Sequence, residues 1–203
     1  MGAVAAAPRR ESPQRSTSPV VSQSKFISPL KTAMYSAAQE KAWSRFYRDG
    51  VPIGRELKIE KTLGKGMYSV VKKGVEVGGS GCEYAIKIIT KDSAFDRGEL
   101  MSEVLAMSCV DHPNCMALHR IYEDDESVYF VVDLLSGGEL LDRVISQGKF
   151  SERDAALLAR DVLTALEHLH QKGIVHRDIK PENLLYSCSK RSDKNYSLVC
   201  TCA

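Results

Sequence analysis

A single change of hydrophobic period, at residues 136–138, limits the fold of this chain more than any other feature of its sequence. Before that point, alternating apolar and polar residues predict five strands, two of them around a glycine-rich turn in 57–77 and the others at 82–89, 116–124 and 127–135. One helical stretch, from about residue 93 to residue 108, interrupts the strands. After that point, apolar residues recur every three or four positions. This order predicts an α+β protein in which a small antiparallel sheet lobe precedes a helical lobe.

The helical lobe is predicted to contain a short helix at 138–148 and a long one after Ser151. The Ser151 hydroxyl can accept hydrogen bonds from the first backbone N–H groups, and Glu152 and Asp154 suit the positive end of the helix dipole. Gly173 is a suitable C-terminal stop. The expected apolar face of this helix consists of Ala155, Leu158, Val162, Leu166 and Leu169, and that of the earlier helix of Leu100, Val104 and Met107.

Residues 1–50 differ in composition from the rest and are predicted to be a disordered tail rich in Ser, Pro and Ala, with the ordered domain at 51–203. Within the tail, 34–48 could form a short helix with Trp43, Phe46 and Tyr47 near one face. Three Ser-Pro pairs are candidate phosphorylation sites, although such pairs are common in disordered tails; they begin at Ser12, Ser18 and Ser28. Gly2 is not expected to be myristoylated, because Ala6 stands where Ser or Thr is usual.

The charge balance restricts the classes of partner. With 28 basic and 26 acidic side chains the net charge is +2, which argues against a nucleic-acid binder that works through a basic surface. No stretch is long and apolar enough to predict a membrane span. The six cysteines form no pair of C-x-x-C knuckles, and Cys200 and Cys202 alone are a weak metal signal. A reduced, cytoplasmic setting is expected; the alternative is an organelle, suggested by the acid-poor, Arg- and Ser-containing start of the chain.

Two patterns in the sheet lobe indicate a phosphate site. The turn at 64–71 carries Gly64 and Gly66 between two strands, where backbone N–H groups can approach phosphate oxygens, although a glycine turn alone is weak evidence. Lys87 lies in the apolar strand after that turn, and a buried ammonium requires a partner. Glu103 on the following helix is the predicted partner, with two solvated surface charges as the alternative.

The run IVHRDIKPENLLY, at 174–186, is the most specific signal in the chain. It supplies the carboxylate of Asp178, the ammonium of Lys180 and the amide of Asn183 within one short loop. A carboxylate can orient a hydroxyl and accept its proton, a cation can stabilise a transferring phosphate, and an amide oxygen can bind a metal ion. The run therefore predicts phosphoryl transfer to a hydroxyl group.

With these three elements in this order, the chain resembles the protein kinase family of Ser/Thr type over about residues 57–199. HPN at 112–114, SGGELLDRV at 136–144 and HRDIKPENLLY give it a likeness to the calcium/calmodulin-dependent group. The resemblance implies a two-lobed fold with ATP and Mg²⁺ between an N-terminal lobe and hinge at 57–135 and a partial C-terminal lobe at 136–203. It also implies protein substrates with Ser or Thr near basic residues, a preference that Glu139 and Glu182 suggest.

The resemblance assigns roles to individual residues. Asp178 would be the catalytic base, Lys180 would contact the terminal phosphate, and Asn183 would bind a Mg²⁺ ion. Val132 would be the gatekeeper. The implied nucleotide site consists of Leu63, Gly64, Gly66, Ser69, Val71, Ala85, Lys87, Glu103, Asp133, Leu135, Glu139 and Leu185. Ser69 stands where the family has its third loop glycine.

The resemblance ends before the D-F-G motif, which the family has after one further hairpin. Residues 196–199 look like the start of the expected strand, but the sequence that follows does not, so the domain is expected to be truncated and the chain inactive by itself. Two functions remain open. The first is a Ser/Thr kinase recorded as an incomplete chain, and the second is a non-catalytic isoform that binds nucleotide or competes for partners. Regulation by calcium or calmodulin is not visible in these residues.

Overall fold

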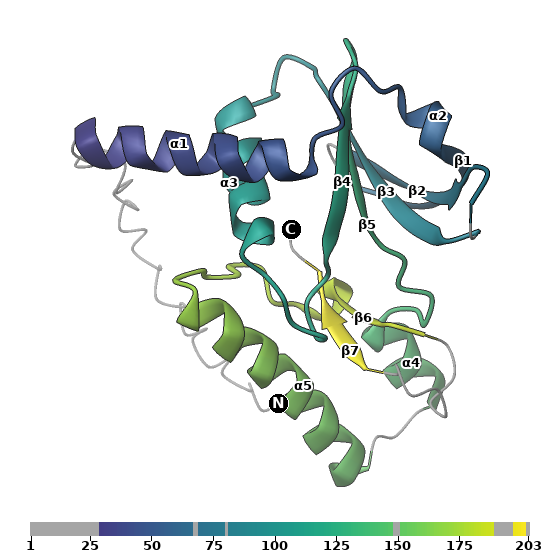
Figure 1. Ribbon diagram of the computed structural model, residues 1–203. Coiled ribbons are helices and arrows are strands. Elements are labelled where there is room, and N and C mark those ends of the chain that lie inside the picture. Colours follow the sequence, from purple (N-terminus) through teal and green to yellow (C-terminus); the bar gives the residue numbers. More distant parts are fainter. Residues whose placement is uncertain (1–28, 67–68, 80, 148–150, 189–196, 202–203) are drawn as a thin grey trace, which may run out of the picture.

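The computed structural model describes residues 29–66, 69–79, 81–147, 151–188 and 197–201 (Figure 1). The candidate phosphorylation sites in the tail, Gly2, Cys202 and the insert at 189–196 lie outside these residues. A five-stranded antiparallel sheet has the order β1-β2-β3-β5-β4. Its strands are β1 (Leu57–Lys65), β2 (Ser69–Glu76), β3 (Glu83–Thr90), β4 (Leu118–Glu123) and β5 (Ser127–Asp133). The predicted α+β fold and its sheet lobe are confirmed.

The two faces of the sheet have separate cores, as the alternating sequence requires. On β3, Ala85 packs with Val132 and Phe130 beneath the helices of this lobe. Its neighbour Ile86 packs with Leu57 on the opposite face. That opposite face continues into the four-residue helix α2 (Ile53–Glu56), which precedes β1 and was not predicted.

Helix α3 (Arg97–Ser108) is the predicted helix between the third and fourth strands, but it begins four residues after residue 93. The cap explains the difference, because the Asp96 carboxylate accepts hydrogen bonds from the N–H groups of Gly98 at 2.7 Å and Glu99 at 3.2 Å. Its buried side is confirmed and includes one further residue: Leu100, Met101, Val104 and Met107. The helix therefore presents a packed face to the sheet lobe.

Helix α1 (Pro29–Phe46) corrects the predicted tail, because the disorder expected for residues 1–50 is wrong over this helix. The helix expected at 34–48 is confirmed, with a longer N-terminal part. Trp43 is only 5% exposed and joins the core beneath α3, with Phe46 and Tyr47 packed against that core. Packing on a neighbouring helix, which composition does not reveal, orders this segment.

The helical segment consists of α4 (Leu140–Gln147), α5 (Glu152–Gln171), a 3₁₀ turn at Pro181–Asn183, and the hairpin of β6 (Leu184–Tyr186) with β7 (Leu198–Cys200). The predicted caps of α5 are confirmed: Ser151 Oγ accepts from the Asp154 N–H at 3.1 Å, and Gly173 has φ 74°. The predicted apolar face is wrong at Ala155, which is exposed. Instead, Ala165 is buried with Leu169 against the hairpin.

The loop between α3 and β4 joins the two lobes. Asn114 is buried, and its Nδ2 donates to the Leu198 carbonyl at 2.7 Å. The Cys200 N–H donates to the Asn114 carbonyl at 2.9 Å, and the Met116 N–H donates to the Cys200 carbonyl at 3.2 Å. The loop therefore acts as a short parallel neighbour of β7. No helix in the part of the chain that the structure describes is long and apolar enough to cross a membrane.

The same loop contacts α5 through two histidines, which predicts a pH dependence of stability. The rings of His112 and His168 lie 5.2 Å apart, and each accepts a backbone N–H bond at 3.2 Å, from Asn114 and Asp111 respectively. Burial, followed by the charge of His168, lowers the pKa of His112 from 6.5. The unfolded chain therefore takes up this proton at a higher pH than the folded protein does. We expect the free energy of unfolding to be highest above pH 6.5 and to fall as the pH drops through 6.5 toward the folded pKa.

Thermal unfolding of wild type and His112→Gln between neutral pH and about pH 5.5 measures this effect. The variant should lose part of the acid-induced fall in Tm. His170→Gln is the matched control, because the His170 ring is exposed on α5, the helix that also carries His168. An identical fall in Tm in wild type and His112→Gln would contradict the expectation.

Candidate nucleotide and phosphotransfer site

Lys87 and Glu103 form the ion pair that the sequence predicts. Lys87 Nζ lies 2.8 Å from Glu103 Oε1, and the two side chains are 23% and 20% exposed. Lys87 comes from β3 and Glu103 from α3, so the pair fixes the helix against the sheet. Glu103 neutralises the ammonium of Lys87 within the protein. Because both side chains remain partly open to solvent, the ammonium can still contact an anion from outside.

The glycine-rich turn is described on either side of residues 67–68. The Gly66 N–H donates to the Ser69 carbonyl at 2.8 Å, which closes the turn between β1 and β2. An added Cβ at Gly64 would meet no atom within 4 Å, whereas one at Gly66 would lie 3.3 Å from Ser69 Oγ. The space beside Gly64 is therefore open to a ligand, as the predicted phosphate contact requires.

The apolar floor expected for a nucleotide base is formed in part. Val71 packs against the same core as Ala85 and Val132, and β3 and β5 place Ala85 directly opposite Val132. Leu63 is exposed, while Leu135 and Leu185 are half-buried. Leu185 enters from the helical segment, where it pairs with Glu139 in an isolated antiparallel bridge.

Asp133, which the sequence assigns to the nucleotide site, has its carboxylate bound to β4. Its Oδ1 lies 2.7 Å from His119 Nε2, and its Oδ2 accepts from the Ala117 N–H at 2.9 Å. Burial raises the pKa of Asp133, but the hydrogen bonds from His119 and then Ala117 outweigh it and leave the pKa lowered. Any contact of Asp133 with a nucleotide would therefore be made by its backbone.

The short catalytic loop brings together the three residues with predicted chemical roles. Asp178 Oδ2 accepts from Lys180 Nζ at 2.7 Å and from Asn183 Nδ2 at 2.8 Å, and Asn183 Nδ2 also donates to the Asp178 carbonyl at 2.8 Å. The 3₁₀ turn between them folds Asn183 back toward Asp178. The hydrogen bond from Lys180, and then that from Asn183, lowers the pKa of Asp178, so its carboxylate is ionised at neutral pH.

Two backbone features hold this loop in place. Arg177 has φ 66°, a left-handed conformation that is unusual for a residue other than glycine and marks a tight reversal just before Asp178. His176 Nε2 lies 2.9 Å from the Thr201 carbonyl, and the Thr201 N–H donates to the Asn183 carbonyl at 3.0 Å. The end of β7 therefore supports both sides of the loop.

The donor set gives limited support for Mg²⁺. Asn183 donates through its amide nitrogen, so its carbonyl oxygen is the group that can bind a hard cation. Over the described ranges, no group of three or more His, Cys, Asp or Glu side chains could hold a metal ion by itself. These residues fit an ion that arrives with phosphate oxygens and water as its other ligands, as is usual for Mg²⁺.

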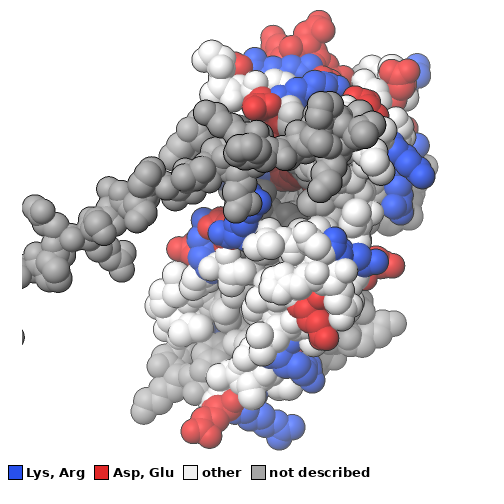
Figure 2. Space-filling model, turned by 90° about the vertical axis from the view of Figure 1, so that its left-hand side faces the viewer, with Lys and Arg blue, Asp and Glu red and all other residues white. Residues whose placement is uncertain are grey.

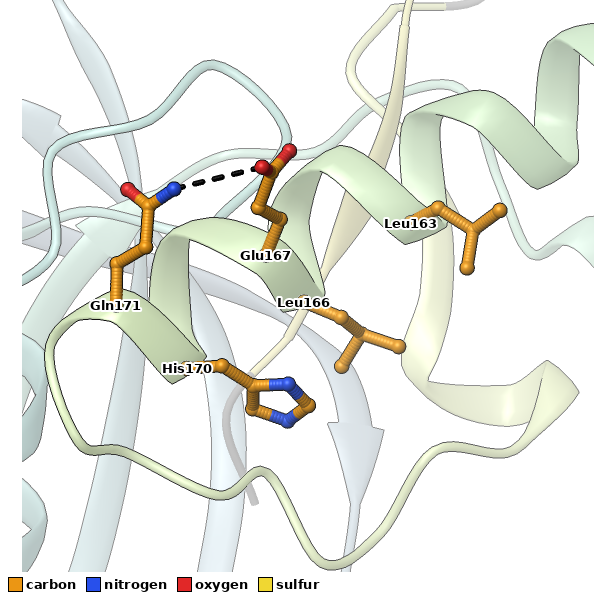
Figure 3. A pocket seen from close by; sticks show the side chains of 5 residues that line it. All are labelled: Leu163, Leu166, Glu167, His170 and Gln171. Carbon is orange, nitrogen blue, oxygen red and sulfur yellow. Dashed lines mark hydrogen bonds between the residues drawn. The ribbon is translucent and has the colours of Figure 1, made fainter.

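A hollow on the helical segment lies away from these residues. It has a volume of about 570 Å³ on α5 and is lined by Leu163, Leu166, Glu167, His170 and Gln171 (Figure 3). Gln171 donates to Glu167 at 3.4 Å, and Leu163 is 63% exposed. In the view of Figure 2, charged side chains of both signs lie close together at the top of the molecule and are scattered among uncharged side chains lower down. The predicted core position Leu166 thus belongs to the open side of α5.

A polar network on the opposite face of the sheet, around Arg120 and Tyr122, was not predicted from the sequence. Arg120 on β4 donates to Glu76 on β2 at 2.7 Å, and Tyr122 Oη donates to Glu56 on α2. Burial, followed by the hydrogen bond to Glu56, raises the pKa of Tyr122 to about 12. These contacts join segments that are distant in sequence, and no local pattern in β4 indicates them.

Comparison with known proteins gives a consistent result. A model of the protein kinase domain matches residues 57–195. Calcium-dependent protein kinase 5 of Plasmodium falciparum is 44% identical over 124 residues, which cover 61% of this chain and 22% of that protein. Calcium/calmodulin-dependent protein kinase type IV of Mus musculus is 38% identical over 136 residues, 67% of this chain and 28% of that protein. The chain thus spans well under half the length of these relatives.

The matched residues run from the first strand of the sheet through the paired lysine to the loop that holds Asp178. Agreement in order, spacing and geometry cannot come from a shared turn or a single motif. The chain belongs to the protein kinase family and, within it, resembles the calcium- and calmodulin-dependent Ser/Thr kinases.

Proposed function

We propose that this protein transfers the terminal phosphate of MgATP to Ser or Thr hydroxyls of protein substrates. The observation that carries the proposal is the loop in which Lys180 and Asn183 both donate hydrogen bonds to the carboxylate of Asp178. Asp178 would hold the substrate hydroxyl and accept its proton, and Lys180 would move from Asp178 to a phosphate oxygen. Asn183 would supply one oxygen ligand to the magnesium ion, which neutralises phosphate charge when it is bound.

Two exposed carboxylates support a preference for basic residues in the substrate. Glu139 precedes α4, and Glu182 lies in the 3₁₀ turn next to the catalytic loop. Neither side chain is buried, so each can meet an arginine or lysine of a peptide without a large desolvation cost. The names of the relatives add a second proposal, that calcium, with or without calmodulin, regulates the activity.

Titration of the chain with a non-hydrolysable ATP analogue and Mg²⁺, followed by phosphorylation assays on paired peptides, tests the proposal. We expect the chain to bind the analogue. In the transfer assay, run on a form of the protein that also includes a D-F-G motif, we expect a peptide with Arg before its Ser to react faster than the same peptide with Glu in that place. Asp178→Asn is the control: it should keep the affinity for the analogue and lose transfer. Transfer that persists in this variant would show that the activity comes from a contaminating enzyme.

The same assays separate the alternative function. Binding of the analogue without transfer to any peptide would favour a non-catalytic nucleotide-binding or partner-competing protein. Absence of binding in a folded sample would contradict both the kinase proposal and that alternative in its nucleotide-binding form. Calcium and calmodulin added to the transfer assay, against a chelator, test the regulatory proposal.

A further inference from the structure

Helix α1 lies across α3, and its C-terminal end reaches β4 of the sheet (Figure 1). Its contacts run along the whole of α3. Gln39 Nε2 donates to Ser102 Oγ at 3.0 Å and to the Gly98 carbonyl at 3.4 Å, and Arg45 donates to the Ser108 carbonyl at 3.3 Å at the other end. The last of these places a cation at the negative end of the α3 dipole, which is stabilising.

Trp43 makes the apolar part of the same contact. It is buried in the core that includes Val104 and Met107 of α3. The Arg97 guanidinium, also on α3, lies 4.8 Å from the centre of the Trp43 ring and donates to Glu123 of β4 at 2.7 Å. The Arg48 N–H donates to the Ile121 carbonyl of β4 at 2.9 Å, so the segment after α1 is fixed to the sheet as well.

Helix α3 carries the acidic half of the pair in the candidate site. Ser102, which receives the hydrogen bond from Gln39, is the immediate neighbour of Glu103, which binds Lys87. In a helix, a rotation or shift that moves one residue moves its neighbour by the same amount. The position of α1 is therefore coupled through one rigid element to the distance between Glu103 and Lys87.

We propose that α1 is a brace that holds α3 in the position where Glu103 pairs with Lys87, and that Gln39 and Trp43 are positioning residues for the phosphotransfer site. The proposal depends on the proposed function for one consequence only, which is that release of α1 from α3 should weaken nucleotide binding. The geometry itself, α1 on α3 and Glu103 on Lys87, is independent of catalysis. By linkage, a nucleotide bound at Lys87 must in turn stabilise the docking of α1.

The test measures the exposure of the Lys87 amine, with the full chain, by acylation with a lysine-reactive ester and peptide mass spectrometry. While the Lys87 ammonium is paired with Glu103, Lys87 Nζ reacts slowly with the ester. Gln39→Ala should raise the labelling rate of Lys87 about five-fold, the change expected when a contact worth one net hydrogen bond is lost. Trp43→Ala, which removes a buried ring from the same contact, should raise it by at least as much. Lys58, which is 73% exposed on β1, is the internal reference.

Three variants control for general loss of structure. Trp43→Phe keeps an aromatic ring in the core and should restore labelling close to the wild-type rate. Met34→Ala changes an exposed residue of the same helix and should have no effect. Leu57→Ala creates a cavity on the opposite face of the sheet, so it lowers stability without touching α1 and should leave Lys87 labelling unchanged.

Trp43 is the only tryptophan in the sequence, so its fluorescence reports whether α1 is docked in Gln39→Ala. Increased quenching of Trp43 together with faster labelling of Lys87 would support the brace. Faster quenching with unchanged labelling would overturn it, as would equal labelling in Gln39→Ala and Leu57→Ala. If wild type binds no ATP analogue, the proposed function fails while the labelling result still decides the brace.

Discussion

Gly137→Ala is expected to lower the free energy of unfolding by about 3 kcal/mol, the upper part of the range for overpacking, and the Tm by about 10 °C. A Cβ at this position would lie 2.3 Å from the Cys188 carbonyl oxygen and 2.4 Å from Tyr186 Cβ. The Gly137 N–H also donates to the Tyr186 carbonyl at 3.0 Å, so the two backbones are already in contact. Because the obstacle on Cys188 is backbone, it cannot be relieved by a change of rotamer.

Thermal and chemical unfolding of the purified variant measure this loss, and Gly54→Ala is the matched control. A Cβ at Gly54 would meet no atom within 4 Å, and the residue lies in the short helix α2, where alanine is favoured over glycine. We expect Gly54→Ala to change stability by less than about 1 kcal/mol. Equal stability of the two variants would mean that the segment after the hinge does not lie against β6 as described.

Lys87→Met is expected to weaken binding of an ATP analogue and Mg²⁺ by at least about ten-fold, since hydrogen bonds to charged groups contribute about 1.5–3 kcal/mol. The substitution removes the cation from the phosphate site and leaves the Glu103 carboxylate there without its partner at 2.8 Å. Repulsion between that carboxylate and phosphate then adds to the loss. Replacing both residues, as Lys87→Met with Glu103→Gln, should recover part of the affinity.

Isothermal titration provides the affinities, and Lys73→Met is the control because Lys73 is also a strand lysine paired with a carboxylate, that of Glu83. It lies on β2 and is not part of the candidate site, so the affinity should stay within about two-fold of wild type. An affinity that is the same in Lys87→Met as in wild type would exclude Lys87 from the nucleotide site. Melting curves of each variant confirm that the protein being titrated is folded.

The parts of the fold that the sequence predicts are those in which neighbouring residues decide the outcome. Alternation along β3 separates Ala85 from Ile86 because successive residues of a strand face opposite sides. Ser151 and Gly173 bracket α5 through their own backbone contacts. The catalytic loop is predictable for the same reason, since Asp178 and Asn183 are only five residues apart.

What the sequence does not predict depends on pairing between distant segments. Asp133 is bound by His119 because of the register between β4 and β5, which shifts between Leu118 and Arg120. No local pattern specifies that shift. The helix at 34–48 is predicted, but its start at Pro29 and its packing with α3 are not, because they depend on a segment distant in sequence. On α5, apolar residues occur on more than one side, so the period alone placed Leu166 incorrectly.

The contact between the Asn114 loop and β7 also determines the order in which the chain can fold. The Asn114 carbonyl accepts from the Cys200 N–H and its Nδ2 donates to the Leu198 carbonyl, so this link closes a loop of more than eighty residues. The sheet lobe can form from nearby segments, and the loop can meet α5 through His168, whereas the part of the attachment made by β7 must wait until residues 198–200 have been synthesised. During synthesis, the face of α5 that meets the hairpin therefore stays uncovered longest, and it is the surface on which a chaperone would act.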